Sequence, residues 1–395
     1  MSYAIGVITF VVALLLSVML HEAGHFATAK AFGMKASRFF VGFGPTLWST
    51  KRGETEYGIK AIPAGGFVKI EGMTALEELE PGDEDRAFYK QPALQRTIVL
   101  AAGSVVHFIL AIGILFAVIA ATGSDPVHVR PSTTIDAVEK CVPRNPNATA
   151  CAATDPAAPA HGVLRAGDKV VAVNGTAVST YNQMAAKLRA APGTVVHVTV
   201  LRDGKQLTFG LKTVPVEQDG KLVGKIGISP EIENIPVSVA GAVPKTFTTL
   251  GYFAKSTVTA LGGLPHEISG IVEGKPRNPE GAASVVDVAR VSGQIAEAKA
   301  SVGARVAQLM LLVAELNFFV GIFNLLPLLP LDGGHIGILA FEKVRGAAYR
   351  LFGRRDPGRV DIMKVLPLTY AVVAVFVGLS LILLYAGITD PIKLQ

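Results

Sequence analysis

The chain is 395 residues long, with a formal net charge of +6, 50% hydrophobic residues, 17% charged residues and a mean hydropathy of +0.45. This composition is too apolar and too poor in charge for an ordinary soluble protein, so we predict a polytopic membrane protein. We expect no nucleic-acid partner, because no nucleic-acid-binding motif is present and Lys and Arg fall mostly beside apolar stretches, as membrane topology requires.

The first predicted element, residues 1–30, is a transmembrane helix that ends in His21-Glu22-Ala23-Gly24-His25. Residues four apart share a helix face, so His21 and His25 can direct ring nitrogens at one cation, with Glu22 beside them as a candidate general base. The alternative is a helix end whose polar side chains lie among lipid headgroups. No basic residue precedes the apolar core, so we expect a retained span rather than a cleaved signal peptide.

Residues 31–96 form a predicted β region. The stretch 39–72 is rich in glycine and alternates apolar with polar residues, which indicates short strands and tight turns. Between two spans it could be a re-entrant hairpin, which is tolerated where its edge faces protein or a cavity, or a plain cytoplasmic hairpin. Residues 74–85 are acidic and predict a flexible loop.

The second predicted span, residues 97–122, is apolar apart from Ser104 and His107. An intramembrane His should face the protein interior. We expect a packing role for His107 rather than a metal role, because the candidate metal site already has two imidazoles.

Residues 123–233 predict a soluble domain. A turn, an alternating strand and an Asn-Gly hairpin turn occupy residues 161–175, a short amphipathic helix follows at Tyr181 to Arg189, and residues 195–211 form another hairpin. The segment resembles a PDZ domain, with the family signature matched by Gly162-Val163-Leu164, Gly167-Asp168 and Val173-Asn174-Gly175. PDZ domains bind extended peptides by strand addition, so a peptide at this groove is a candidate partner.

Residues 234–305 predict an amphipathic connecting region. Residues 243–264 are amphipathic, residues 265–280 are rich in Gly and Pro and suggest a loop, and residues 282–304 suggest a helix.

The third predicted span, residues 306–335, ends in Asn324-Leu325-Leu326-Pro327-Leu328-Leu329-Pro330-Leu331-Asp332-Gly333-Gly334-His335. Its prolines and glycines break the helix and free backbone carbonyls where Asp332 lies, which is tolerated in a membrane only inside protein. A basic cytoplasmic loop, residues 336–364, and a fourth span, residues 365–388, complete the chain.

The order of the spans places the first and third parallel, so His21, His25 and Asp332 should arrive at one membrane face. The basic residues that follow both spans assign that face to the cytoplasm. The N-terminus and the PDZ-like domain, with Cys141 and Cys151, then lie outside. An oxidising compartment favours a disulfide between these cysteines, with two free thiols as the alternative.

Two His and one Asp make a three-ligand set for one zinc ion per chain, with a fourth position open for water, as in catalytic sites. Iron or cobalt could occupy the same set. Such a metal activates water, Glu22 would accept the proton, and the predicted reaction is amide hydrolysis.

The motifs in this order closely resemble those of the site-2 proteases, over nearly the whole chain. The resemblance is carried by His21-Glu22-x-x-His25, Gly42-Phe43-Gly44, Pro63-x-Gly65-Gly66-Phe67, the PDZ-like segment and Asn324-x-x-Pro327-x-x-Pro330-Leu331-Asp332-Gly333-Gly334. The chain looks most like bacterial members that cleave membrane-spanning anti-sigma factors, and its loops look actinobacterial. The resemblance implies a multi-pass protein of the bacterial inner membrane, in contact with membrane lipid, with its active site near the cytoplasmic face.

By the same resemblance, His21, His25 and Asp332 would bind zinc and Glu22 would be the base. Asn324 would hold the unwound substrate or its oxyanion, next to the helix break at Pro327, and the strand Gly42-Phe43-Gly44 would pair with the substrate. The implied substrates are single-pass membrane proteins, cut after another protease has shortened them in transmembrane stress signalling.

Two departures from the family pattern stand out. Many relatives carry Ala-Gly-Pro and a later Asn in the second span, whereas this chain has Ala102-Gly103-Ser104-Val105-Val106-His107, and the stretch before the third span matches less closely. A zinc transporter and a non-catalytic peptide-sensing scaffold are the rival hypotheses. The predicted fold is a polytopic α-helical membrane protein with four transmembrane helices, a re-entrant β-hairpin and an extracytoplasmic PDZ-like α+β domain.

Overall fold

The fold is described from a computed structural model, which covers residues 2–73, 79–143, 151–218, 221–274, 281–355, 357–360 and 362–391. The chain divides into two compact units, one formed by Met1–Thr122 with Val239–Gln395 and the other by Gly123–Ser238. The expected acidic loop at residues 74–85 lies partly outside the described residues, and its remainder contains the short 3-10 helix η1, Glu84–Arg86. A second 3-10 helix, η2, covers Phe88–Lys90.

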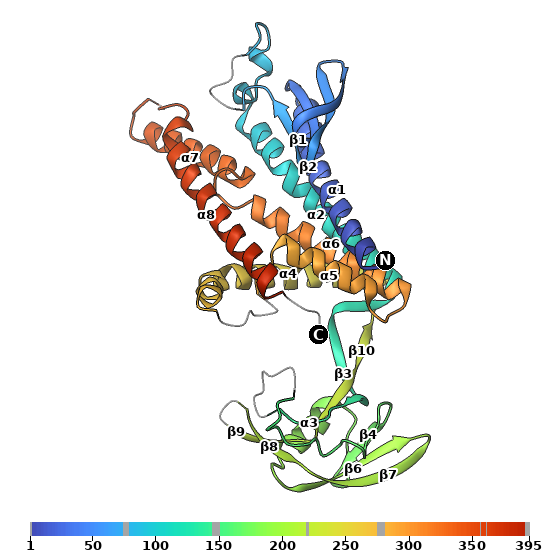
Figure 1. Ribbon diagram of the computed structural model, residues 1–395. Coiled ribbons are helices and arrows are strands. Elements are labelled where there is room, and N and C mark those ends of the chain that lie inside the picture. The colour runs from blue at the N-terminus through green and yellow to red at the C-terminus, as the bar shows by residue number, and fades with distance from the viewer. Residues whose placement is uncertain are drawn as a thin grey trace. The chain divides into compact units, whose positions relative to one another are not determined.

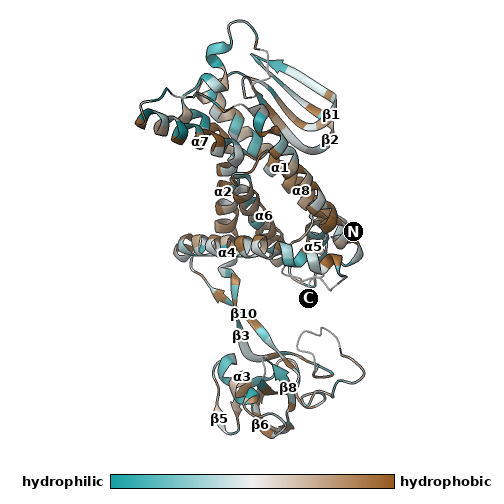
Figure 2. Cartoon of the chain, turned by 90° about the vertical axis from the view of Figure 1, so that its left-hand side faces the viewer, coloured by the Kyte–Doolittle hydropathy of each residue, from teal (hydrophilic) through white to brown (hydrophobic). Residues whose placement is uncertain are grey.

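The first unit is mainly helical (Figure 1). Its helices are α1 (Ser2–Ala31), α2 (Ala93–Thr122), α4 (Val239–Val272), α5 (Val285–Glu297), α6 (Val302–Asn324), α7 (Asp332–Leu351) and α8 (Ile362–Thr389). Four described stretches are long and apolar enough to cross a membrane: Ser2–Ala31, Ala93–Thr122, Val302–Asn324 and Lys364–Thr389. The hydropathy colouring of Figure 2 marks these helices as mainly apolar. The prediction of a polytopic membrane protein with four spans is therefore supported.

The β region between α1 and α2 consists of two long strands, β1 (Ala36–Arg52) and β2 (Thr55–Ile70). They pair antiparallel with several register shifts, so that residues 38–41 contact residues 66–69 on one side and residues 56–59 on the other. The bend in β1 requires glycine: Gly42 has φ +87°, and a Cβ there would lie 2.6 Å from the carbonyl oxygen of Ile62.

A buried cluster joins this β region to the ends of α1 and α2. It contains Ala29, Met34, Ala36, Ile70, Phe88, Val99, Leu100 and Leu339. An ion pair outside the spans also stabilises this region. Both terminal guanidinium nitrogens of Arg86 donate to the Glu54 carboxylate, at 2.6 and 2.8 Å. Arg86, with Lys30, lowers the pKa of Glu54 to about 2, so this carboxylate stays ionised and binds the hairpin turn to the end of α1.

The second unit contains a six-stranded sheet with the order β10-β3-β4-β6-β7, in which β5 also pairs with β4. The strands are β3 (Ser124–Val138), β4 (Lys169–Val173), β5 (Thr176–Ala177), β6 (Val195–Arg202), β7 (Lys205–Lys212) and β10 (Ile228–Pro236), with a separate pair β8 (Val214–Gln218) and β9 (Lys221–Lys225). The helix α3, Tyr181–Arg189, has the predicted bounds and is capped by Thr180, whose side chain accepts from the Gln183 amide. The predicted hairpins at residues 174–175 and 195–211 are present.

Three expectations for the helical region are wrong. Residues 265–272 are not a loop, because α4 continues through Pro265, which removes one backbone hydrogen bond without ending the helix. Residues 282–304 are not one helix, because α5 ends at Glu297 and Ser301 caps the start of α6. Residues 336–351 are not a loop, because a proline-free stretch of good helix formers continues α7.

The third span also ends earlier than predicted. α6 stops at Asn324, and residues 325–331, which include Pro327 and Pro330, turn the chain. Asp332 is therefore the first residue of α7 rather than the end of the third span.

Candidate metal centre

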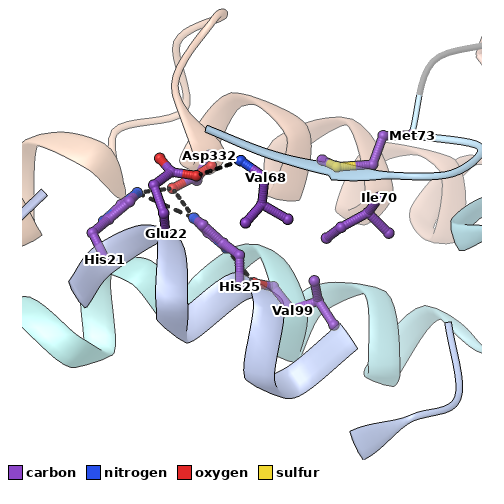
Figure 3. Close-up of a pocket in the computed structure, with 8 residues that line it drawn as sticks. All are labelled: His21, Glu22, His25, Val68, Ile70, Met73, Val99 and Asp332. Carbon is purple, nitrogen blue, oxygen red and sulfur yellow. Dashed lines mark hydrogen bonds and ion pairs between the residues drawn. The ribbon is translucent and has the colours of Figure 1, made fainter. Parts of the chain in front are cut away.

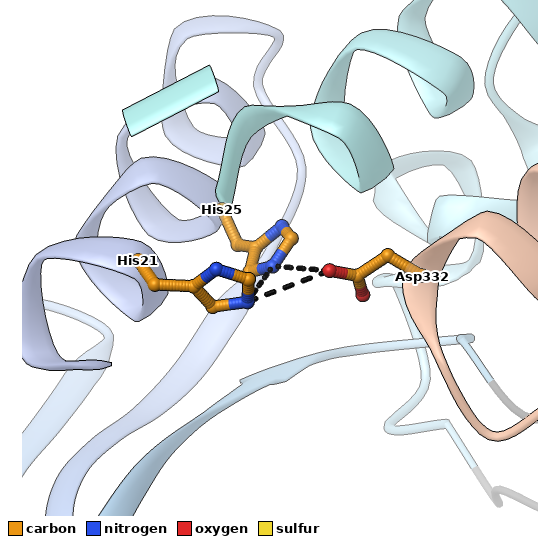
Figure 4. A group of neighbouring side chains, drawn as sticks. All are labelled: His21, His25 and Asp332. Carbon is orange, nitrogen blue, oxygen red and sulfur yellow. Dashed lines mark hydrogen bonds and ion pairs between the residues drawn. The ribbon is translucent and has the colours of Figure 1, made fainter. Parts of the chain in front are cut away.

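Two helices that are distant in the sequence bring three candidate metal ligands together (Figure 4). His21 and His25 lie one turn apart on α1, and Asp332 begins α7. Oδ2 of Asp332 lies 3.4 Å from Nε2 of His21 and 3.3 Å from Nε2 of His25. One ligand atom from each residue lies within 4.8 Å of the others. Three donor atoms therefore converge on one point, as the order of the spans predicted.

The hydrogen bond of His25 to α2 decides which nitrogen faces this point. Nδ1 of His25 lies 2.7 Å from the carbonyl oxygen of Val99. A carbonyl only accepts, so Nδ1 carries a proton, and Nε2 is the nitrogen that faces Asp332. A cation, either a metal ion or a proton on Nε2, is required between this nitrogen and the carboxylate oxygen. The donor set thus fits a metal ion, and the backbone carbonyl orients the ligand ring.

His21 is held by close contact with α2. A Cβ at Gly103 would lie 2.4 Å from Cε1 of the His21 ring, so only glycine leaves room for this imidazole. One turn further along α2, the His107 ring centroid lies 5.0 Å from that of His21.

His107 is not part of the three-residue cluster. Its Nδ1 lies 2.8 Å from Oδ1 of Asn317, whose amide nitrogen donates to the carbonyl oxygen of Val313 at 2.8 Å. Because the Asn317 amide nitrogen is the donor to α6, its Oδ1 accepts from His107. This buried arrangement agrees with the expected packing role of His107.

Glu22 faces β2 across the same space (Figure 3). Its Oε2 accepts a hydrogen bond from the backbone N–H of Val68 at 3.0 Å. A Cβ at Gly66 would lie 3.5 Å from Cγ of Glu22, so the strand approaches the carboxylate closely. A cavity of about 160 Å³ opens here, lined by His21, Glu22, His25, Val68, Ile70, Met73, Val99 and Asp332. The general-base candidate and the three donor atoms therefore share one cavity.

Five other predicted site residues lie elsewhere. Asn324 is the last residue of α6, and Pro327 follows in the turn toward α7. Gly42, Phe43 and Gly44 form the bend in β1, where the Phe43 ring stacks on Phe67. None of the five is among the residues that line the cavity.

Cys141 and Cys151 form a disulfide in the second unit, with Cα atoms 5.9 Å apart. The sequence motifs did not indicate three contributors to the site: the Val68 amide, the Val99 carbonyl and the space above Gly103. Two of these are backbone groups, which leave no trace in residue identity. A glycine inside an apolar helix does indicate close packing, and Gly103 could have been found by that signal.

Comparisons with known proteins agree with this geometry. Residues 9–354 match the model of peptidase family M50. The chain is 37% identical to the zinc metalloprotease Rip1 of Mycobacterium tuberculosis, over the full length of both proteins. It is 36% identical to Rip1 of Mycolicibacterium smegmatis, again over the full length of both.

The chain belongs to peptidase family M50, the site-2 proteases, and is a zinc metalloprotease of that class with membrane-spanning helices.

Proposed function

We propose that this protease hydrolyses peptide bonds in or near the transmembrane segments of single-pass membrane proteins. Anti-sigma factors already shortened by another protease are the proposed substrates, in transmembrane stress signalling. The observation that carries the proposal is the position of the donor cluster. His21 and His25 lie in the C-terminal half of an apolar helix, and Asp332 joins them where a second apolar helix has been broken.

The proposed roles follow from the chemistry of each side chain. His21, His25 and Asp332 hold the zinc ion, which polarises the scissile carbonyl and activates water when bound. Glu22 accepts the proton of the attacking water and delivers it to the leaving amine. The hydrogen bond from Val68 holds the Glu22 carboxylate toward the cavity, where that proton transfer takes place.

Hydrolysis within a membrane also requires an unwound substrate, because a helix conceals its carbonyls in hydrogen bonds. We assign the replacement partners to Asn324, to the broken segment at Pro327 and to the bent strand Gly42-Phe43-Gly44. Apolar side chains around the bend support a re-entrant position for the hairpin. Those exposed there are Phe43, Leu47, Trp48, Ile59 and Ile62.

We further propose that the second unit is a PDZ-like domain outside the cytoplasm, and that the active site lies near the cytoplasmic face of the inner membrane. The domain would filter substrates or bind a peptide in the groove beside α3. A sheet with a short helix, and a disulfide between Cys141 and Cys151, support this assignment. The basic residues after α1 and after α6 support the orientation.

The variant Glu22→Gln tests the function. It keeps the size of the side chain and the contact with Val68 but cannot accept a proton. In proteoliposomes that contain a single-pass model substrate, we expect unchanged zinc content and loss of cleavage. Full cleavage by this variant would refute the protease mechanism. In cells, membrane fragments that accumulate with Glu22→Gln and not with the wild type would identify the substrates.

A further inference from the structure

The helix that begins with Asp332 has an exposed apolar stripe. On α7, Phe341 is 56% exposed, Val344 69% and Leu351 83%, and Phe352 directly after the helix is 77% exposed. Residues spaced by three and seven positions lie on one side of a helix, so these side chains form one continuous stripe. Exposed side chains of this size and number require a covering surface.

The opposite side of α7 is already covered. Ile336 and Leu339 pack against Val99 and Leu100 of α2. Glu342 accepts from the backbone N–H of Val360 at 2.8 Å. Beside the stripe, Arg345 donates to the carbonyl oxygen of Gly358 at 2.7 Å, and its guanidinium lies 5.4 Å from the centre of the Phe341 ring. Within the described residues, Val344 and Leu351 therefore stay exposed on a side of α7 that the first unit does not cover.

Basic side chains flank the Val344 and Leu351 part of the stripe, about 100° around the helix from it and on the side of α7 away from Phe341. Lys343 and Arg350 are exposed two turns apart on α7, and exposed Arg354 and Arg355 follow it. Seven basic residues and four acidic residues lie between Asp332 and Lys364. Figure 2 shows hydrophobic and hydrophilic residues alternating along α7, unlike the uniformly apolar spans. An apolar stripe beside basic residues is typical of helices that lie in the surface of an anionic bilayer.

The position of α7 in the chain favours the same surface. It begins eight residues after the end of the apolar helix α6 and is followed by the span Lys364–Thr389. Seven connecting residues reach at most about 25 Å, so the start of α7 stays close to the membrane end of α6.

We propose that α7 lies in the membrane interface and binds anionic phospholipids. The stripe Phe341, Val344 and Leu351 enters the boundary between headgroups and acyl chains, and Lys343 and Arg350 bind lipid phosphates. The proposal rests on the four spans crossing a bilayer and does not depend on the assignment of the zinc ligands. Because Asp332 is the first residue of α7, lipid binding also fixes the depth of this carboxylate relative to α1.

Native mass spectrometry of the full-length protein tests whether Lys343 and Arg350 bind anionic lipids. The protein would be exchanged into equal amounts of phosphatidylglycerol and phosphatidylcholine, and the lipids that stay bound would be counted. Each Lys or Arg near an anionic membrane surface contributes roughly fivefold to association. We expect the wild type to retain phosphatidylglycerol preferentially, and Lys343→Gln with Arg350→Gln to reduce that preference roughly 25-fold.

The matched control is Lys187→Gln with Arg189→Gln, two basic residues in the last turn of α3 in the other unit. It should keep the wild-type preference. The conservative pair Lys343→Arg with Arg350→Lys should also keep it, and unchanged zinc content in every variant would show that the fold is intact. Equal retention of both lipids by the wild type, or an undiminished preference in the glutamine pair, would overturn the proposal.

A spin label on α7 tests whether the apolar stripe enters the membrane. Cys141 and Cys151 are joined in a disulfide, so a label on Leu351→Cys reacts at one site. In phosphatidylglycerol vesicles we expect this label to be accessible to oxygen and shielded from a water-soluble nickel complex. A label on Asn182→Cys of α3 should show the reverse. Free access of nickel to position 351 would refute the proposal, and shielding from both reagents would instead indicate a protein contact such as a second copy of the chain.

Discussion

The backbone N–H of Val68 donates a hydrogen bond to Oε2 of Glu22 over 3.0 Å, although 46 residues separate them in the sequence. The contact couples β2 to the turn of α1 that carries the proposed ligands His21 and His25. It fixes one carboxylate oxygen by a backbone donor that every residue except proline would supply.

Shortening the Glu22 side chain should therefore reduce the rate of cleavage and leave the fold intact. Glu22→Asp withdraws the carboxylate by one methylene and loses the Val68 contact, so we expect normal zinc content and cleavage reduced by about 10²-fold or more. Val68→Ala is the matched control, because it keeps the backbone donor, and cleavage should change by no more than a few fold. A large loss in Val68→Ala would show that the side chain, not the N–H, matters.

Metal binding should require that residue 103 has no side chain, because the His21 ring occupies the place of its Cβ. In Gly103→Ala the new methyl would meet the His21 ring, which must move, and changes in groups that orient a ligand reduce metal affinity by about 10- to 100-fold. Gly113→Ala on the same helix is the control, since no heavy atom lies within 4 Å of its added Cβ. Zinc per chain, measured after dialysis against a chelator, should fall in the first variant alone. Equal zinc in both would contradict the packing argument.

Removing the carboxylate of Asp332 should weaken zinc binding more than any other change on α7. Asp332→Ala leaves two imidazole donors and an open, uncharged position, so we expect zinc to be lost at low chelator concentrations. Glu342→Gln, ten residues along the same helix, should retain zinc. Titration with a fluorescent chelator would measure both, and wild-type affinity in Asp332→Ala would exclude this residue as a ligand.

The second unit should lose stability in acid through one ion pair. Arg202 donates to both oxygens of the buried Asp168, at 2.7 Å each, and thereby holds the pKa of that carboxyl below its usual value. A depressed pKa stabilises the fold above the ordinary value of about 3.9 and loses this contribution as the pH falls through the folded-state pKa.

Hydrogen exchange of β4 and β6 amides, followed between pH 6 and pH 3, measures that loss. Asp168→Asn should lower the unfolding free energy by about 2 kcal/mol at pH 6 and flatten the acid dependence. Asp203→Asn, in the adjacent exposed turn, should behave like the wild type. An unchanged pH profile in Asp168→Asn would assign the acid sensitivity to other groups.

The disulfide should stabilise the same unit. Cys141 and Cys151 close a loop with a sequence separation of 10 residues, for which loop entropy gives about 3 kcal/mol. Replacing both by serine should lower the unfolding free energy by roughly that amount, while zinc content remains normal. Identical gel mobility of alkylated samples with and without reductant would show that the bond does not form.

Local signals in the sequence predicted much of the fold. The spans follow from hydropathy, and the bounds of α3 and the turn at Asn174-Gly175 follow from residues whose conformational preference is local. The convergence of His21, His25 and Asp332 followed from counting spans. These features needed no knowledge of side-chain packing.

The remaining features depend on tertiary contacts. α4 continues through Pro265 because packing overrides the local effect of proline. α7, by contrast, follows from local helix propensity, which the clustered charge of the segment concealed. The partners of Glu22 and His25 are the backbone groups of Val68 and Val99, which every residue type offers. Residue identity therefore could not select them.

The distance along the chain between His25 and Asp332 has a consequence for biosynthesis. Membrane chains are made from the N-terminus, so α1 exists long before α7 has left the ribosome. The donor set is completed only after three of the four spans and the whole second unit have been synthesised. A stalled or truncated product thus retains the two imidazoles without the carboxylate, and with the proposed ligand set the late arrival of Asp332 would keep unfinished copies of this protease inactive in the membrane.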